Sequence, residues 1–200
     1  MKEKFINSSI SFISKYEECD DLKIKKLKYG LEGIYSLIVK ISIVLIISIF
    51  TKTILETLLF ILFYAGIRTF SFGWHAKSNI GCWITTILVY NIIPLLIFNL
   101  QINNYINYII LGISALSMIL WSPADTPKRP LIRKEARKKS KILSIIVIII
   151  YTIICLYINN HTLKNIILYS LIVQTILINP LTYKLTNTQF NNYKYYKKKG

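Results

Sequence analysis

One histidine and one cysteine stand seven residues apart between two apolar runs of the chain, at His75 and Cys82. A cysteine is a good nucleophile as its thiolate, and a neighbouring histidine can take the thiol proton and hold the charge as an ion pair. The two residue types could therefore perform acyl transfer. The alternative is structural, because a buried cysteine usually serves as a small apolar filler and a histidine near lipid headgroups as an interfacial residue.

The spacing of the two residues constrains their geometry. Seven residues are close to two helical turns, so one straight helix would put His75 and Cys82 on one face with Cα atoms about 10.5 Å apart. Side chains barely span that distance, whereas Gly73 and Gly81 offer places for the backbone to bend. We expect a broken or re-entrant segment, with Cys82 near a helix N-terminus whose dipole favours a thiolate.

The remaining cysteines indicate neither a disulfide framework nor a metal site. Cys19 and Cys155 are widely spaced and form no CxxC motif, and we expect no cofactor. His161 follows Cys155 by six residues and forms the weaker of the two candidate His/Cys pairs.

Apolar segments on both sides must position these residues. They approach the roughly 17–25 residues of a membrane-spanning helix, lack a polar stripe, and are too long and evenly apolar for barrel strands. The six segments are 34–50, 53–67, 82–100, 105–121, 142–158 and 163–182. The pattern predicts an all-α integral membrane protein with about six membrane helices, one or two of them short or re-entrant. Segment 53–67, which carries Glu56, is the weakest of the six.

The remaining segments are polar or amphipathic. Apolar residues recur at approximately helical spacing among lysines and glutamates, at Phe5, Ile6, Ile10, Ile13, Leu22 and Leu27. This predicts an N-terminal amphipathic interfacial helix within residues 1–33, with a mobile charged leader as the alternative. A polytopic membrane domain then covers 34–182, including segment 68–82 and a basic loop at 122–141. Residues 183–200 form a basic tail.

Basic residues also predict the orientation. The chain has a net charge of +16, and 22 of its 25 lysines and arginines fall in residues 1–33, 68–81, 122–141 and 183–200. Short basic loops remain cytoplasmic, so both termini and the His75/Cys82 segment are expected in the cytoplasm, with six crossings between them. The charges are divided among helix flanks and are not gathered with aromatics into one groove, which favours a lipid bilayer partner over nucleic acid.

Two motifs together resemble a known family. Arg68, His75 and Cys82 follow at successive seven-residue intervals, and the run Ser122–Leu131 (SPADTPKRPL) comes two apolar segments later. This combination resembles the accessory gene regulator protein B family, membrane endopeptidases of Gram-positive quorum-sensing systems, over nearly the whole chain. One departure is that Phe72-Gly73 stands where the family commonly has two adjacent glycines.

The resemblance implies a site and a substrate. It places His75 and Cys82 on the family's catalytic pair and Arg68 on a basic residue associated with activity, and it implies a multi-pass protein of a Gram-positive cell membrane. The implied substrate is a signal propeptide with an amphipathic N-terminal helix and an acidic C-terminal tail, which Cys82 cleaves through a thioester before a thiolactone or lactone ring closes.

Further residues are assigned by interpretation. Arg68 and the backbone amides around Gly81 are candidate oxyanion donors. Basic residues of the 122–141 loop could bind the acidic tail, and positive-inside anchoring explains them equally well; those we select for tail binding are Lys128, Arg129, Arg133, Lys134, Arg137 and Lys138. Pro123 and Asp125 are expected to be structural, with Asp125 pairing with Arg68 or capping a turn.

Two other classes of function remain open. A small transporter or exporter of a peptide would use the intramembrane Lys40 and Glu56, although both lie near segment ends where snorkelling explains them. A non-catalytic scaffold for an exported peptide would require an inert Cys82. The oligomeric state is open as well, with a homodimer as one alternative.

Overall fold

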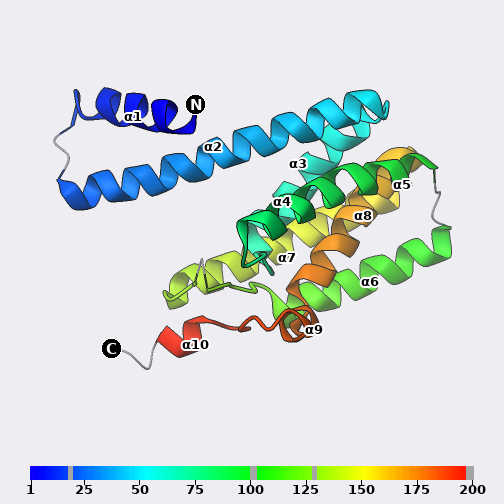
Figure 1. The fold of residues 1–200 in the computed structure, drawn as a ribbon. Coiled ribbons are helices and arrows are strands. Elements are labelled where there is room, and N and C mark those ends of the chain that lie inside the picture. The colour runs from blue at the N-terminus through cyan, green and yellow to red at the C-terminus, as the bar shows by residue number, and fades with distance from the viewer. Residues whose placement is uncertain (18–19, 100–102, 128–129, 197–200) are drawn as a thin grey trace. The chain divides into compact units, whose positions relative to one another are not determined.

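A computed structural model describes residues 1–17, 20–99, 103–127 and 130–196, whose regular structure is helical (Figure 1). Five of the helices are long and apolar enough to cross a membrane, and Tyr105–Trp121 is a shorter apolar helix. The prediction of an all-α membrane protein is therefore confirmed. The chain divides into two units, Met1–Ile47 and Ser48–Gly200, which are taken in turn.

The first unit contains α1 (Lys2–Ile13) and most of α2 (Asp21–Phe50). The two helices contact each other through the rings of Phe5 and Tyr35, whose centroids are 5.7 Å apart, and through an ion pair between Lys2 and Glu32 at 3.2 Å. Ile6 is buried at 2% exposure. The apolar side of the N-terminal segment thus packs on α2.

The N-terminal amphipathic helix is α1, which carries Phe5, Ile6, Ile10 and Ile13. Leu22 and Leu27, which the sequence pattern grouped with them, belong to α2. The physical reason is an N-cap: the Asp20 carboxylate accepts a hydrogen bond from the Lys23 amide at 2.8 Å, and Asp21 places a second negative charge in the first turn. A membrane helix therefore begins well before residue 34.

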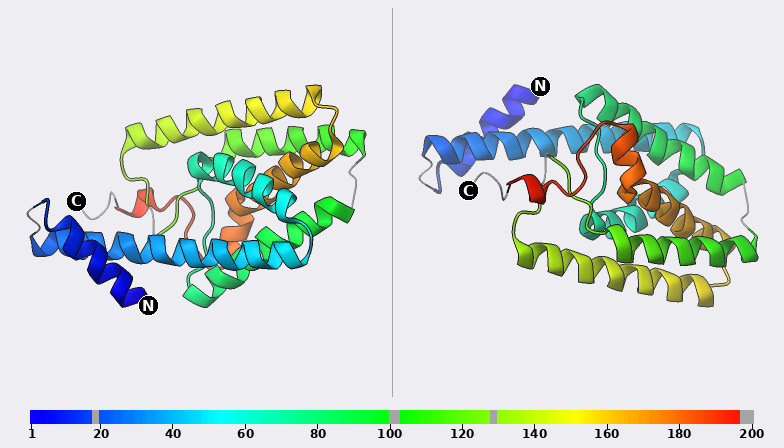
Figure 2. Two further views of the ribbon diagram at one scale, coloured as in Figure 1. Left: turned by 90° about the horizontal axis from the view of Figure 1, so that it is seen from above. Right: turned by 90° about the horizontal axis from the view of Figure 1, so that it is seen from below.

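The second unit is built around α8. Its helices are α3 (Ile54–Ser71), α4 (Asn79–Ile87), the π-helical turn η1 (Leu88–Ile92), α5 (Ile93–Asn99), α6 (Asn104–Trp121), α7 (Lys134–Tyr157), α8 (His161–Ile178), α9 (Pro180–Leu185) and α10 (Tyr193–Tyr196). Helix α8 contacts α3, α5, α6 and α7, and half of it is buried, more than of any other long helix. Helices α6 and α7 run side by side (Figure 2).

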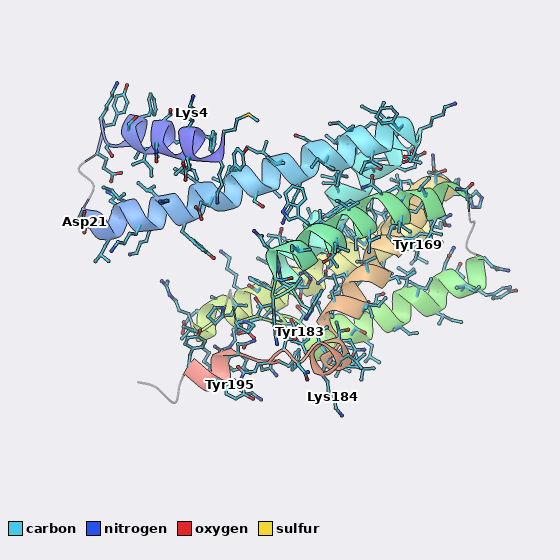
Figure 3. The ribbon with its side chains drawn as sticks, in the orientation of Figure 1. Lys4, Asp21, Tyr169, Tyr183, Lys184 and Tyr195 are labelled. Atoms are coloured by element: carbon cyan, nitrogen blue, oxygen red, sulfur yellow. The ribbon has the colours of Figure 1, made fainter. Side chains whose placement is uncertain are left out.

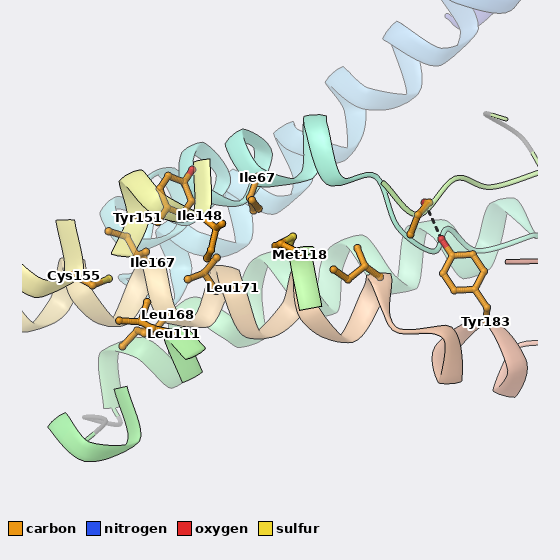
Figure 4. Close-up of a cluster of buried hydrophobic side chains, with 12 residues drawn as sticks. Ile67, Leu111, Met118, Ile148, Tyr151, Cys155, Ile167, Leu168, Leu171 and Tyr183 are labelled. Carbon is orange, nitrogen blue, oxygen red and sulfur yellow. Dashed lines mark hydrogen bonds between the residues drawn. The ribbon is translucent and has the colours of Figure 1, made fainter. Parts of the chain in front are cut away.

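The core of this unit joins four helices. Ile67 of α3, Met118 of α6, Ile148 of α7 and Leu171 of α8 are each at most 2% exposed and belong to one apolar cluster (Figure 4). Many other isoleucines and leucines of the same helices are about half exposed, among them Ile149. In a membrane helix such outward apolar residues face lipid, so burial and lipid contact together explain the nearly uninterrupted apolar runs.

Proline and asparagine explain two boundaries within the predicted segments. Pro94 has no amide hydrogen to donate, and the turn that precedes it, η1, is π-helical. Asn179 accepts a hydrogen bond from the Leu181 amide at 2.9 Å and places Pro180 at the first position of α9. The segment predicted at 163–182 is therefore two helices, α8 and α9.

Gly66 offers a test of the packing between α3 and α7. A Cβ there would lie 2.5 Å from the Tyr151 hydroxyl, which donates to the Phe63 carbonyl at 2.7 Å. Gly66→Ala should therefore cost about 1–3 kcal/mol of unfolding free energy relative to Gly112→Ala, because Gly112 has no such neighbour. Thermal unfolding in detergent measures the difference. Equal midpoints for the two variants would contradict this packing.

Candidate active site

The connection between α3 and α4 carries the histidine. Helix α3 ends at Ser71, because Phe72 (φ 58°) and Gly73 (φ 117°) both leave the helical region. The backbone then pairs with two distant segments: the Gly73 amide donates to Ala124 O at 2.7 Å, and the Trp74 amide donates to Leu177 O at 2.7 Å. Phe72 and Ala124 also form an isolated parallel bridge. The predicted break in the helix is confirmed.

Arg68 satisfies the carbonyls of this connection. Its Nη1 donates to Phe72 O at 2.8 Å, and its Nη2 donates to Gly73 O at 3.2 Å and to Trp74 O at 2.6 Å. A guanidinium binding three consecutive carbonyls replaces the hydrogen bonds that the broken helix loses. Arg68 therefore positions the segment that leads into His75, and it does not pair with Asp125.

Gln174 of α8 also hydrogen-bonds to the start of this connection. Its amide nitrogen donates to Ser71 Oγ at 2.5 Å and to Phe72 O at 2.7 Å, and the side chain is fully buried. The sequence interpretation missed this residue. The available signal was a polar side chain inside a predicted membrane segment, which is costly unless it is hydrogen-bonded.

Gly73 cannot be replaced without displacing its neighbours. Its positive φ favours glycine, and a Cβ would lie 2.4 Å from Arg68 Nη1 and 3.0 Å from Leu177 O. The bend predicted at Gly73 is therefore confirmed. Gly81, the other place where the backbone could bend, lies within the first turn of α4, which Ser78 caps, so the bend is at Gly73 alone of the two.

The connection brings the histidine to the cysteine. His75 Nε2 lies 3.5 Å from Cys82 Sγ, where one straight helix would separate their Cα atoms by about 10.5 Å. His75 Nδ1 lies 3.0 Å from Ala76 O. A carbonyl can only accept, so Nδ1 carries the hydrogen and the neutral ring presents the Nε2 lone pair to the thiol. This arrangement suits transfer of the thiol proton to imidazole.

The cap of α4 uses the amides that the sequence suggested as oxyanion donors. The Gly81 amide donates to Ser78 Oγ at 2.9 Å, and the Cys82 amide donates to Ser78 O at 3.1 Å. Neither amide is available to a substrate in this conformation. The same cap does place Cys82 in the first turn of α4, as predicted, near the positive end of the helix dipole.

A cavity of about 170 Å³ opens beside the pair. Its walls come from α3, the α3–α4 connection, α4 with η1, and α8; the lining residues are Tyr64, Arg68, Trp74, His75, Ala76, Cys82, Thr85, Thr86, Val89, Tyr90 and Leu177. Six of the eleven side chains are apolar or aromatic. The polar groups of the lining residues are the thiol, the imidazole, the Arg68 guanidinium, the Trp74 indole and the hydroxyls of Thr85, Thr86, Tyr64 and Tyr90. A peptide segment entering the cavity would meet Cys82 in a largely apolar setting.

Asp125 has a structural role at a separate junction. Its fully buried carboxylate accepts hydrogen bonds from the backbone amides of Asn192 at 2.7 Å, Tyr193 at 3.0 Å and Leu131 at 3.1 Å. The expected structural assignment fits this geometry, although the backbone of the C-terminal segment is the partner and Arg68 is not. Pro123 lies beside it in the non-helical stretch that follows α6.

Tyr183 links this junction to the α3–α4 connection. Its hydroxyl donates to Ala124 O at 3.0 Å (Figure 4). Ala124 O also accepts from the Gly73 amide. Tyr183 points into the bundle, while its neighbour Lys184 is exposed (Figure 3). Burial raises the pKa of Tyr183, opposed by the Arg68 charge and reinforced by Asp125, so the phenol remains a hydrogen-bond donor at neutral pH.

The basic residues selected for tail binding differ in whether they have partners in the fold. Arg137 is engaged, since its Nη1 donates to Leu131 O at 2.7 Å and its guanidinium lies 4.0 Å from the Tyr193 ring centroid. Arg133, Lys134 and Lys138 are exposed at the start of α7. Two of the residues selected from sequence, Lys128 and Arg129, lie outside the described residues.

The second His/Cys candidate is not supported by burial. Cys155 is 3% exposed within the core of the bundle, whereas His161 is exposed at the start of α8. Cys82 is partly exposed beside its imidazole. Of the two His/Cys pairs, the one that lines the cavity is His75 and Cys82.

Fold and site together define an all-α membrane protein with a thiol and an imidazole in contact at the edge of a cavity. The chain belongs to the accessory gene regulator B family, whose model matches residues 6–178. It is 37% identical to an AgrB-like protein of Listeria monocytogenes, over 86% of this chain and 84% of that one. It is 30% identical to accessory gene regulator protein B of Staphylococcus aureus, over 88% and 93%. No solved structure matches the chain.

The contact between His75 and Cys82 predicts that the imidazole increases the reactivity of the thiol. A free cysteine is only a few per cent thiolate at pH 7, so an imidazole that accepts its proton speeds alkylation. His75→Ala should slow iodoacetamide labelling of Cys82 at pH 7 by about tenfold. Mass mapping of the Cys82 peptide measures the rate. His161→Ala, the matched control at the chain's other histidine, should leave it unchanged; equal rates for both variants would show that His75 does not assist the thiol.

Proposed function

We propose that this protein is a membrane cysteine endopeptidase that removes the C-terminal tail of a quorum-sensing signal propeptide and promotes closure of its ring. The contact of 3.5 Å between Cys82 Sγ and His75 Nε2 carries the proposal. Membership of the accessory gene regulator B family supports the link to quorum sensing.

The first step forms a thioester. His75 Nε2 takes the thiol proton as Cys82 Sγ attacks the carbonyl of the peptide bond that follows the signal segment. When the tetrahedral intermediate collapses, the carbon–nitrogen bond breaks and the imidazolium returns the proton to the leaving amine. The acidic tail departs with a free amino terminus, and the signal segment stays bound to Cys82.

The second step releases the enzyme. A cysteine thiol or serine hydroxyl within the propeptide attacks the thioester and gives its proton to His75. The bond from carbon to Cys82 Sγ breaks, the thiolactone or lactone closes, and Cys82 leaves as the thiolate beside the imidazolium, which can return the proton to it. The largely apolar lining of the cavity, with Val89 and Leu177 among its walls, supports ring closure over hydrolysis because it limits the water that can reach the thioester.

The charge distribution supports a cytoplasmic site. Short basic segments stay on the cytoplasmic side of a membrane, and the segments that flank Cys82 and lead into α7 are basic. On this assignment both termini and the cavity face the cytoplasm of a Gram-positive cell, where an unexported propeptide is found.

The exposed cations at the start of α7 are suited to the acidic tail. Lys134 and Lys138 lie one helical turn apart on one face, and Arg133 precedes them. Arg137 stabilises the loop through Leu131 and Tyr193, so we assign tail binding to the exposed cations only.

Co-expression with the genomically adjacent propeptide tests the chemistry. Cys82→Ala should lower tail release by at least about a thousandfold because it removes the nucleophile, and His75→Ala should fail similarly. Peptide masses follow the release. Cys155→Ala changes a thiol that does not line the cavity and should leave release near the wild-type rate. Wild-type shortening of the propeptide by Cys82→Ala would refute the peptidase.

Charge reversal tests tail binding. The double variant Lys134→Glu, Lys138→Glu should raise KM about five- to tenfold at low salt with little change in kcat, and the effect should shrink in 0.5 M salt. The control Lys25→Glu, Lys26→Glu makes the same charge change in α2. A KM that rises equally in both variants would contradict a local tail site and indicate a general charge effect.

A further inference from the structure

The thioester-forming step lacks an assigned oxyanion donor. When Sγ attacks, the substrate carbonyl oxygen becomes negative and needs a preorganised hydrogen-bond donor in the cavity. The amides of Gly81 and Cys82 are bound to Ser78, and the Arg68 guanidinium is bound to three carbonyls of the α3–α4 connection. The hydroxyls of Thr85 and Thr86, which also line the cavity, donate to Gly81 O and Cys82 O. All these donor groups already have backbone partners, so a donor in the cavity wall without one is the better candidate.

Two tyrosines of that wall carry hydroxyl donors. Tyr64 of α3 and Tyr90 of η1 both line the cavity that contains Cys82 and His75. Among the described residues, neither phenol makes a hydrogen bond. A phenol held in a largely apolar wall without a protein partner is available to a substrate carbonyl.

Tyr64 is the better fixed of the two. Its ring is parallel to that of Phe60 (5.6 Å, 3°) and makes an edge contact with Tyr90 (5.7 Å, 75°), which also contacts Phe60 at 5.8 Å, so the three rings form one cluster. It is 6% exposed and lies on α3, one turn before Arg68. Tyr90 is less buried and lies in the π-helical turn. Deeper burial on a regular helix preorganises the Tyr64 hydroxyl better than that of Tyr90, as an oxyanion donor requires.

The indole of Trp74 is the remaining nitrogen donor to consider. Its Nε1 has no hydrogen-bond partner among the described residues, but this atom is buried away from open space. It cannot reach a ligand in the cavity without a movement of the ring. The Tyr64 side chain lines the cavity, and its hydroxyl is not buried in the same way, so it needs no such movement.

We propose that the Tyr64 hydroxyl donates a hydrogen bond to the oxyanion formed when Cys82 attacks the propeptide. The inference rests on the proposed function. As the sulfur–carbon bond forms, the carbonyl π electrons move to oxygen, and the Tyr64 O–H stabilises that charge while keeping its proton. On collapse the carbonyl reforms, the carbon–nitrogen bond breaks, and the amine takes its proton from His75.

Steady-state kinetics of Tyr64→Phe test the donor, because this change removes one hydroxyl and keeps the ring that packs against Phe60 and Tyr90. With a synthetic propeptide, kcat for tail release should fall about a hundredfold with KM within about twofold of wild type. Tyr169→Phe is the matched control: it removes a phenol packed against the same apolar cluster, outside the cavity lining, and should keep wild-type kcat.

Alkylation of Cys82 separates stabilisation of the oxyanion from activation of the thiol. Iodoacetamide reacts with Cys82 without forming an oxyanion, so Tyr64→Phe should label at the wild-type rate while its kcat falls. Labelling that slows in parallel with kcat would show that Tyr64 acts on the thiol and would overturn the proposal. A kcat loss in Tyr90→Phe with none in Tyr64→Phe would overturn the choice of donor.

Cys82→Ala distinguishes failure of this inference from failure of the proposed function. If Cys82→Ala still releases the tail, the peptidase itself is refuted. If Cys82→Ala is inactive and Tyr64→Phe keeps wild-type kcat, the peptidase stands and only the assignment of Tyr64 is wrong.

Discussion

The interruption between α3 and α4 is the constraint on which the site depends. In a membrane protein, backbone groups released by a broken helix need partners inside the protein, because hydrocarbon supplies none. The Arg68 guanidinium binds the carbonyls of Phe72, Gly73 and Trp74, and Ala124 and Leu177 accept the amides of the last two. With those groups paired, the chain can turn back and place His75 against Cys82 without the cost of unpaired backbone.

The hydrogen-bond partners of the α3–α4 connection come from distant parts of the chain, so the site depends on the tertiary structure. Gln174 and Leu177 lie near the end of α8, and Ala124 follows α6. The Ala124 carbonyl also accepts from Tyr183, and the next residue, Asp125, binds the amides of Asn192 and Tyr193. The C-terminal segment, which the sequence suggests only as a basic tail, thereby supports the α3–α4 connection through the backbone around Ala124 and Asp125.

Hydropathy predicted the helices because lipid and core both select apolar residues, and the His75/Cys82 spacing correctly indicated a break. The boundaries depended on local capping signals that hydropathy does not contain, such as Asp20. Gln174 could be suspected as a polar residue in an apolar run, but its partners are about a hundred residues away and follow only from the fold. The proposed chemistry depends on the resemblance, because the His75/Cys82 spacing alone is also consistent with a cysteine that only fills space.

The central claim is that this geometry makes Cys82 the acyl acceptor. Its most direct measurement is the intact mass of the protein after incubation with a propeptide whose ring-closing cysteine is replaced by alanine, so that the thioester has no internal nucleophile. We expect an adduct with the mass of the signal segment, mapped to Cys82 and removed by hydroxylamine. Release of the tail without any adduct at Cys82, at times short compared with hydrolysis, would contradict it.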